Sequence, residues 1–425
     1  GAPGASPTVR VRGVGSFEGG GAPLYVVDGM FFENIDFLNP NDIETISVLK
    51  DASASAIYGV RAANGVVVIE TKGGNYNQEP EIVYDGYYGI QNPQNVLKMA
   101  NSQQFVQYVN ETGSAADMDF VQNAIQRYGR SYIDPSLPAV NTDWYAEMMA
   151  PAAIQNHNLS FNGGGTKTRY SIGASYFDQE GLMKETRNSY QRMNFRVKLD
   201  TDVKEWMTVG GNLNLSTAEQ FNGDNGAWFR SYFAVPILPV YDENNTDATP
   251  YRLSNAQQLG YRSNQNPFYN LLYSDNRNQV AKLLGNFYSE IEIIPNNLTF
   301  KTSYNFSMEN VNSRNVGFAY SDGREERQSS IRKNSFSRYD QIWDNFLTYQ
   351  NNFDLHNLTV VLGQSFRSEK NEVLFARGEN LNPDPMRGDE EFWYLNNATD
   401  YDLNGIGDGG NRLFYQSYFS RVAYN

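Results

Sequence analysis

An acidic segment near the C-terminus has residue types and spacing that could hold a metal ion. Asp400, Asp402, Asn404 and Asp408 follow the pattern D-x-D-x-N-G-x-x-D. In a calcium loop such positions supply side-chain oxygens, and the backbone carbonyl at the position of Ile406 supplies another. The position of the closing glutamate holds an asparagine instead. The spacing therefore predicts either a calcium site without its bidentate carboxylate or an acidic, solvated loop.

Two further segments carry side chains that could contact a solute. One contains Trp228, Phe229, Arg230 and Tyr232, followed by two prolines. Aromatic rings stack on sugars or pack against peptide side chains, and arginine binds carboxylates. The segment therefore predicts substrate contact or, alternatively, packing within a loop or against a partner protein. The other is a glycine-rich segment in which Phe17 and Glu18 either touch substrate or belong to a plain connector.

The composition excludes several kinds of chemistry. There is no cysteine and only 2 histidines, so thiol nucleophiles are excluded, and His157 and His356 both fall in strand-like segments. No glycine cluster precedes a long helix that would cradle a phosphate. A net charge of −14 without a basic stripe argues against nucleic-acid binding. We therefore expect neither an enzyme nor, calcium apart, a cofactor.

The elements that position these segments are strands of alternating polarity. Met193, Phe195, Val197 and Leu199 are apolar, and the residues that alternate with them are Arg, Asn or Lys. The same alternation is found in residues 82–90, 170–176, 209–215 and 298–306. Such alternation predicts sheets with one apolar face, as in a soluble sandwich or a membrane barrel. Lys and Arg on the polar face and aromatic residues near strand ends favour the barrel. No run approaches the roughly 18 apolar residues of a membrane helix.

The connections between the strands are unequal in length. Residues 178–181, 201–205 and 295–297 read as short links, whereas residues 218–277 and 369–411 read as long polar loops. Short turns at one rim and long loops at the other are typical of outer-membrane barrels. Residues 102–111 and 117–129 predict short amphipathic helices, with Phe105, Val106 and Val109 on one face, in a rim insertion.

Residues 1–75 predict a separate small α+β domain, and residues 76–425 the barrel. Residues 25–29 and 66–71 read as short strands, and residues 39–42 as a loop that can cap a following helix. Asp51 is a good N-cap for the Ala/Ser run after it, and Gly59 ends that helix. This pattern indicates a compact unit whose contacts use small residues.

The N-terminal segment resembles the plug of SusC-like TonB-dependent outer-membrane transporters. The resemblance rests on residues 11–16, 22–29 and 38–44, and above all on residues 48–66. Its signature positions are Asp28, Asp51, Tyr58, Gly59, Arg61 and Asn64. The group from Asp51 to Arg61 either has a structural role, as a capped helix with internal ion pairs, or rearranges when TonB pulls the plug. Residues 141–144, 157–164 and 356–364 are similar to barrel segments of that family.

The resemblance implies a mainly β fold, a 22-stranded transmembrane barrel of which this chain supplies about ten or eleven strands, with the plug inside. It implies TonB-dependent import of oligosaccharides or oligopeptides across the outer membrane of Bacteroidota. The implied partners are a SusD-like lid lipoprotein, TonB with ExbB and ExbD, and outer-membrane lipid. Because the sequence begins and ends abruptly, we also expect this chain to be a fragment of a longer protein.

Two other functions remain compatible with the sequence. A structural subunit of an outer-membrane assembly or secretion complex would keep the fold without moving a nutrient. A siderophore or cobalamin receptor would work without a lid protein. The amino-acid sequence of the plug motif favours the SusC-like transporter over the siderophore or cobalamin receptor.

Overall fold

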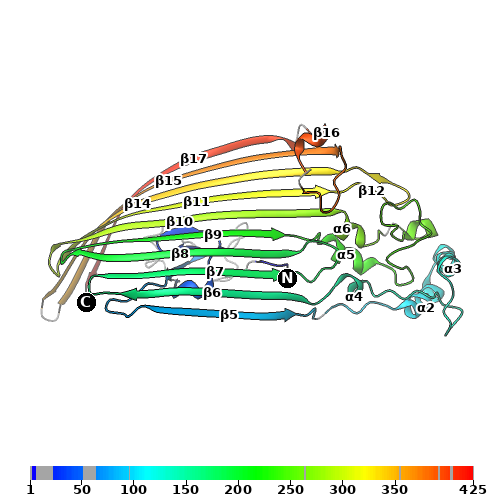
Figure 1. The fold of residues 1–425 in the computed structure, drawn as a ribbon, viewed down its shortest axis with the longest axis horizontal. Helices are drawn as coiled ribbons and strands as arrows, with labels where there is room; N and C mark the ends of the chain where they lie inside the picture. Colours follow the sequence, from blue (N-terminus) through cyan, green and yellow to red (C-terminus); the bar gives the residue numbers. More distant parts are fainter. Residues whose placement is uncertain are drawn as a thin grey trace.

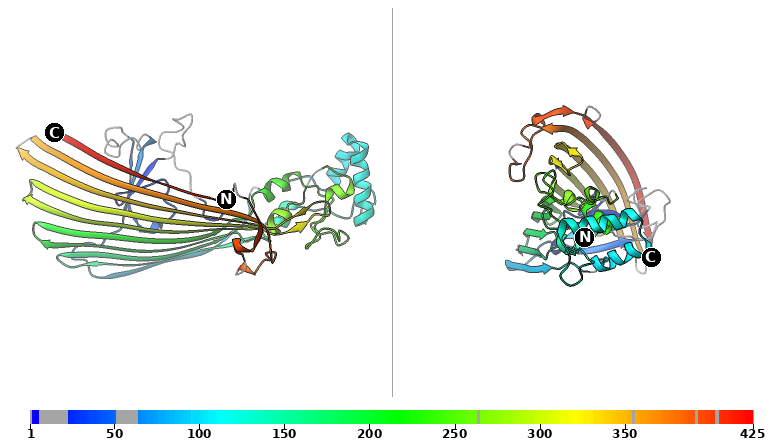
Figure 2. Two further views of the ribbon diagram at one scale, coloured as in Figure 1. Left: turned by 90° about the horizontal axis from the view of Figure 1, so that it is seen from above. Right: turned by 90° about the vertical axis from the view of Figure 1, so that its right-hand side faces the viewer.

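A strongly curved sheet and a small second sheet on its concave side make up most of the chain (Figures 1 and 2). The computed structural model describes residues 2–5, 23–50, 64–94, 96–262, 265–353, 356–390, 393–402 and 405–424. In the part of the chain that it describes, no helix is long and apolar enough to cross a membrane.

The curved sheet, here called the wall, has 11 strands among the described residues, and each pairs with its neighbours in antiparallel register. The count agrees with the predicted ten or eleven. The strands are β5 (Glu81–Gln91), β6 (Ala152–Gly164), β7 (Thr168–Glu180), β8 (Ser189–Lys204), β9 (Met207–Phe221), β10 (Ser274–Ile294), β11 (Leu298–Gly317), β14 (Ser330–Phe353), β15 (His356–Leu381), β16 (Ala398–Tyr401) and β17 (Gly407–Tyr424).

The two faces of the wall are inverted relative to a water-soluble sheet. On β8, Met193 and Phe195 are 57% and 48% exposed on the convex face, whereas Asn194 and Arg196 are only 5% and 1% exposed on the concave face. An apolar face turned outward around a polar interior is the arrangement of a membrane barrel and would be costly in a soluble sandwich. Of the two folds that the alternation allows, a soluble sandwich and a membrane barrel, the structure therefore agrees with the barrel.

The small sheet is formed by the N-terminal segment. Its strands are β1 (Leu24–Val27), β2 (Met30–Phe32), β3 (Ile43–Leu49) and β4 (Val66–Thr71), in the order β2-β1-β4-β3, with β1 and β4 parallel. The expected strands at 25–29 and 66–71 are therefore present. The expectation of a helix after residues 39–42 is wrong: Asn39 caps only the short 3-10 helix η1 (Pro40–Asp42), and the β-branched residues that follow form β3.

The wall has a tight rim and a loop rim. Residues 165–167, 205–206 and 295–297 are tight links, whereas the opposite ends carry the insertions. The prediction of short links at 178–181 and 201–205 is wrong in detail, because β7 continues to Glu180 and β8 to Lys204. The link at 181–188 also lies on the loop rim. The long loops are shorter than predicted, since β9 reaches Phe221 and β15 reaches Leu381.

The insertions at the loop rim are folded, and the segments predicted as long polar loops contain short helices and strands. The helices predicted at 102–111 and 117–129 are present, and each begins with a capping box. The short elements at this rim are α2 (Ser102–Thr112), α3 (Ala115–Tyr128), α4 (Trp144–Met148), α5 (Gly226–Phe233), η3 (Ala256–Leu259), α6 (Phe268–Leu272), β12 (Tyr320–Ser321), β13 (Glu326–Arg327) and η5 (Leu395–Asn397).

These insertions share one hydrophobic core. Phe120, Met148, Ile237, Leu253 and Leu271 are each fully buried in it; Phe120, Met148 and Leu271 come from three different helices, and Ile237 and Leu253 from the connection between α5 and η3. We call residues 96–151 and 222–273 the loop platform. Because its parts bury apolar surface against one another, the platform is an ordered body at the rim and not a set of independent loops.

Candidate functional site

Side chains of one wall strand, β8, bind the backbone of the N-terminal segment. Four alternate residues of β8 point to the concave side and donate hydrogen bonds to carbonyl oxygens of the N-terminal segment. Arg192 donates to Asp36, Asn194 to Phe37, Arg196 to Lys72 and Lys198 to Thr71. The alternation predicted from the sequence therefore places these four donors on one face of the strand, because every second side chain points to the same side.

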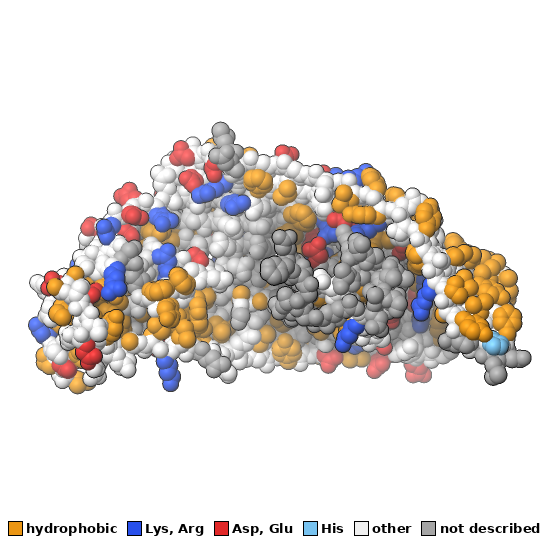
Figure 3. All heavy atoms as spheres, turned by 180° about the vertical axis from the view of Figure 1, so that it is seen from behind, with side chains coloured by type: hydrophobic (Ala, Val, Ile, Leu, Met, Phe, Trp, Pro, Cys, Tyr) orange, Lys and Arg blue, Asp and Glu red, His pale blue; other side chains and the backbone are white. Residues whose placement is uncertain are grey.

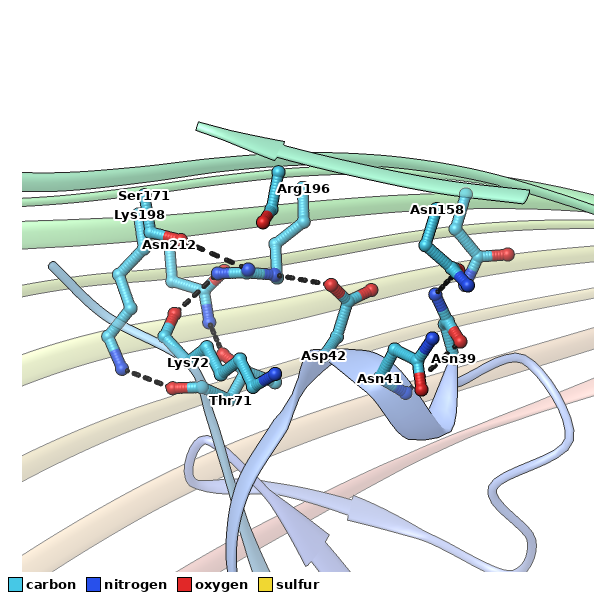
Figure 4. A network of polar contacts seen from close by, with 12 residues as sticks. Asn39, Asn41, Asp42, Thr71, Lys72, Asn158, Ser171, Arg196, Lys198 and Asn212 are labelled. Atoms are coloured by element: carbon cyan, nitrogen blue, oxygen red, sulfur yellow. Dashed lines mark hydrogen bonds and ion pairs between the residues drawn. The ribbon is translucent and has the colours of Figure 1, made fainter. Parts of the chain in front are cut away.

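The centre of this contact is a buried ion pair, shown in Figure 4. The Nε of Arg196 lies 3.3 Å from the Oδ1 of Asp42, and its Nη2 donates to Ser171 at 3.0 Å. The Arg196 side chain is 1% exposed and that of Asp42 11% exposed. A buried charge is tolerated only when it is paired and hydrogen-bonded, which both groups satisfy. The pair therefore makes the two sheets depend on each other.

Asp28, one of the signature positions, links the strands of the small sheet to the wall. Its carboxylate accepts hydrogen bonds from the backbone N–H of Thr71 at 3.0 Å and from the Thr71 hydroxyl at 2.7 Å. The amide of Asn212, on β9, donates to the same carboxylate. Asp28 adopts φ of 45°, in the left-handed region that Asp tolerates better than most residues. The signature aspartate thus has a structural role at this junction.

A cavity of about 530 Å³ lies between the small sheet and the wall. Charged groups of both signs line it, among them Glu70, Lys198, Lys301 and Asp200. Asp200 accepts from Arg169 at 2.9 Å and from the Tyr288 hydroxyl at 2.7 Å. Figure 3, viewed from the side opposite to Figure 1, shows both charged and hydrophobic side chains on this side of the molecule. Apolar side chains such as Phe31 and Phe346 complete the lining, so the space beside the small sheet is mixed in character, with charged groups of both signs among apolar ones.

The aromatic segment predicted to touch substrate forms helix α5 of the loop platform. Phe229 and Tyr232 are 66% and 53% exposed, whereas Trp228 lies against the Tyr145 ring at a centroid distance of 4.6 Å. Arg230 donates a hydrogen bond to Gln265. The structure therefore divides the four predicted residues: Trp228 contributes to packing, and the other three face open space or a neighbouring loop.

A cluster of charged residues at the loop rim joins the loop after β15 to the wall. Glu390 pairs with Arg314 at 2.9 Å and also with Arg187, and Asp275 pairs with Arg314 at 2.8 Å. Burial raises the pKa of Glu390, but the hydrogen bond from Arg314 and the charge of Arg187 outweigh it, so that its pKa lies below the ordinary value. The Trp393 ring packs against Arg314. These contacts fasten the loop after β15 to the wall.

The acidic residues of the predicted calcium loop are separated. Asp400 is opposite Glu379 in the sheet and Asp408 is opposite Leu374, and these β15 positions lie roughly 17 Å apart at about 3.4 Å per residue. Asp402 and Ile406 lie between the two strands, and Asn404 lies outside the described residues. Among the described residues no group of three or more His, Cys, Asp or Glu side chains is placed to hold a metal ion. Calcium binding remains a prediction from the sequence.

Several other predicted residues cannot be placed. Phe17, Glu18, Asp51, Tyr58, Gly59 and Arg61 all lie outside the described residues. Asn64 is described and is half-buried just before β4. Of the six signature residues, the structure therefore places Asp28 and Asn64.

Comparison with known proteins agrees with this architecture. Residues 1–66 match the family described as TonB-dependent Receptor Plug Domain. A TonB-dependent receptor of Formosa agariphila is 30% identical over 88% of this chain, and SusC of Bacteroides thetaiotaomicron is 30% identical over 63% of it. The solved structure of the RagAB peptide transporter superimposes over 100% of this chain with a TM-score of 0.78 at 24% identity.

The chain spans only part of these proteins: 35% of the Formosa receptor, 25% of SusC and 49% of the matched chain of RagAB. The small sheet corresponds to the plug and the wall to a portion of the barrel in which a plug lies. Proteins of this kind reside in the outer membrane of Bacteroidota, and theirs is a family of transporters, not of enzymes. Plug match, curated relatives and fold together show that this chain belongs to the SusC-like TonB-dependent transporters.

Proposed function

We propose that the complete protein imports oligomeric nutrients, either oligosaccharides or oligopeptides, across the outer membrane with energy from TonB, ExbB and ExbD. The observation that carries this proposal is the polar character of the contact between plug and wall. The core of the plug includes Tyr25, Phe37 and Ile69, but of the described wall residues only Leu284. Among the described residues, hydrogen bonds and the buried Arg196–Asp42 ion pair hold the plug, and such contacts can be broken without exposing a large apolar surface.

The loop rim supports a second part of the proposal, a SusD-like lipoprotein that covers the open end. The loop platform is folded and presents exposed aromatic side chains, such as Phe229 and Tyr232, at this rim. Exposed aromatics on an ordered surface are typical of protein or ligand contacts. The relation to SusC and the structural likeness to RagAB support the same arrangement.

Uptake by the native host tests the proposal. We expect deletion of the gene to abolish uptake of one class of fluorescently labelled oligomer, glycan or peptide, and the full-length gene to restore it. Affinity purification of the full-length protein should yield a lipoprotein in equal amount. Unchanged uptake together with defective assembly of other outer-membrane proteins would favour the structural alternative. A growth defect restricted to iron or cobalamin limitation would favour the receptor without a lid.

A further inference from the structure

A second cavity, of about 510 Å³, lies within the loop rim and is separate from the space beside the plug. It lies among α5, the segment before α6 and the β12–β13 hairpin. Three aromatic rings line it, those of Phe229, Phe233 and Tyr269. A pocket of this size with aromatic walls and a few convergent polar groups has the usual character of a ligand site.

In the part of the chain that the structure describes, the arginines at this cavity have no carboxylate partners. Arg230, Arg324 and Arg327 line it, and none of them forms an ion pair with a described residue. Arg230 and Arg324 donate to the side-chain oxygens of neutral glutamines instead. Two carboxylates, those of Asp322 and Glu325, also line the cavity, and the Oδ1 of Asp322 accepts the backbone N–H groups of Arg324 and Glu325, both at 2.9 Å, so the three guanidinium groups outnumber the acids. Guanidinium groups without carboxylate partners are suited to an anionic ligand.

The side chains of the cavity rest on a rigid support. Asn266, 5% exposed, donates from Nδ2 to the carbonyl of Val240 at 2.8 Å and accepts the N–H of Phe268 at 3.0 Å. Asn255 donates to the carbonyl of Asp322 at 2.9 Å and so ties the hairpin to the platform. A site that is already ordered loses less conformational entropy when a ligand binds.

One polar group at this cavity lacks a partner. Tyr269 is 4% exposed, and its hydroxyl forms no hydrogen bond with any described residue. Burial and the nearby charge of Asp322 raise its pKa, so the hydroxyl keeps its proton and can act as a donor. Buried polar groups are nearly always paired in native structures. An unpaired hydroxyl donor beside three arginines that have no described carboxylate partner therefore suits a ligand that carries an acceptor.

We propose that this cavity recognises a carboxylate borne on an apolar or ring-shaped group, with the arginines binding the carboxylate and the aromatic rings packing against the group beside it. The C-terminal residue of an oligopeptide and an acidic sugar of an oligosaccharide both supply this chemistry. The inference rests on the proposed function, because it assigns to an imported oligomer a recognition site outside the plug cavity.

Binding to the purified full-length protein, with any lipoprotein that accompanies it, tests the proposal. The probes are a mixed-sequence hexapeptide pool with free C-terminal carboxylates, the same pool with C-terminal amides, and an oligogalacturonate of similar length. Isothermal titration calorimetry measures each affinity. The variants are Arg324→Gln and Arg327→Gln, both at exposed positions, and the matched control is Arg130→Gln, an exposed arginine of the loop platform outside this cavity.

We expect the free-acid peptide pool or the oligogalacturonate to bind, and each cavity variant to weaken that binding about 10-fold or more, as loss of a charge-assisted hydrogen bond would do. The control variant should bind normally. Preference for the peptide acid over its amide identifies a peptide source, and preference for the oligogalacturonate identifies a glycan source. Equal binding of the acid and amide peptide pools without binding of the oligogalacturonate, no binding of either acid, or equal affinities of variant and wild type would overturn the proposal.

Uptake separates this inference from the proposed function. If cells carrying Arg324→Gln and Arg327→Gln import the labelled oligomer as well as wild type does, and the purified variant also binds as well, the cavity has no such role while import stands. If deletion of the whole gene leaves uptake of every oligomer unchanged, the proposed function itself fails.

Discussion

At the scale of single residues, the junction between plug and wall depends on Arg196. Its guanidinium joins Asp42, the carbonyl of Lys72 and the hydroxyl of Ser171, which belong to three separate parts of the chain. Gly173 leaves room for this arrangement, since a Cβ there would lie only 3.1 Å from the Oδ1 of Asp42. One side chain therefore holds contacts that no local interaction could replace.

We expect Arg196→Ala to loosen the plug without unfolding the wall. The substitution leaves Asp42 buried without its partner, which typically costs about 3–5 kcal/mol. Hydrogen exchange of the amides in β3 and β4 should accelerate on the order of 100-fold, because each 1.4 kcal/mol corresponds to roughly tenfold. Arg130→Ala, at the loop rim, is the control and should leave these amides unchanged. Equal exchange in both variants would show that Arg196 does not hold the plug.

At the scale of elements, the loop platform depends on its shared core. Phe120 is 0% exposed and its ring lies 4.4 Å from that of Tyr261. We expect Phe120→Ala to cost about 3–5 kcal/mol through the cavity that it creates. Hydrogen exchange in α2 and α3 should rise while exchange in β8 and β9 stays constant. Phe229→Ala, which removes a ring that is 66% exposed, should change neither.

The loop after β15 should respond to acid. Because the pKa of Glu390 is lowered in the folded protein, its contribution to stability is fully present above the ordinary pKa of 4.5 and is lost as pH falls through the folded value. Hydrogen exchange of residues 393–402, corrected for intrinsic rates, should therefore accelerate when pH falls from 6 towards about 3. Glu390→Gln should exchange faster at pH 6 and show a flatter pH response. A wild-type loop insensitive to pH would refute this role of Glu390.

The sequence predicts the strands of the wall well and the contacts between elements poorly. Alternation along β8 is a local property, so its polar and apolar faces can be assigned from the residues alone. Asp42 and Arg196 are 154 positions apart, and the residues around each of them give no indication that the two side chains meet. The core of the platform escapes prediction for a related reason: Ile237 and Leu253 lie in irregular segments, which have no period to detect.

At the scale of the whole molecule, the outer face of the wall must lie against lipid. Phe195 lies near the middle of β8, paired with Ala174 and Leu215 on the adjacent strands, and is 48% exposed. We expect Phe195→Arg in the full-length protein to cost about 2–4 kcal/mol, the usual range for Arg near the bilayer midplane. The folded, heat-modifiable fraction in outer-membrane preparations should fall accordingly. Tyr132→Arg, at a fully exposed site of the loop rim, should leave that fraction unchanged.

The four donors of β8 that reach backbone carbonyls have a consequence for how such proteins diversify. Arg192, Asn194, Arg196 and Lys198 each bond to an oxygen that every amino acid possesses. The wall therefore recognises the path of the plug's main chain and is indifferent to most of the side chains along it. Plugs of different sequence could be exchanged between related transporters, as interchangeable parts, provided that Asp28, Asp42 and the course of the chain at 36–37 and 71–72 were preserved.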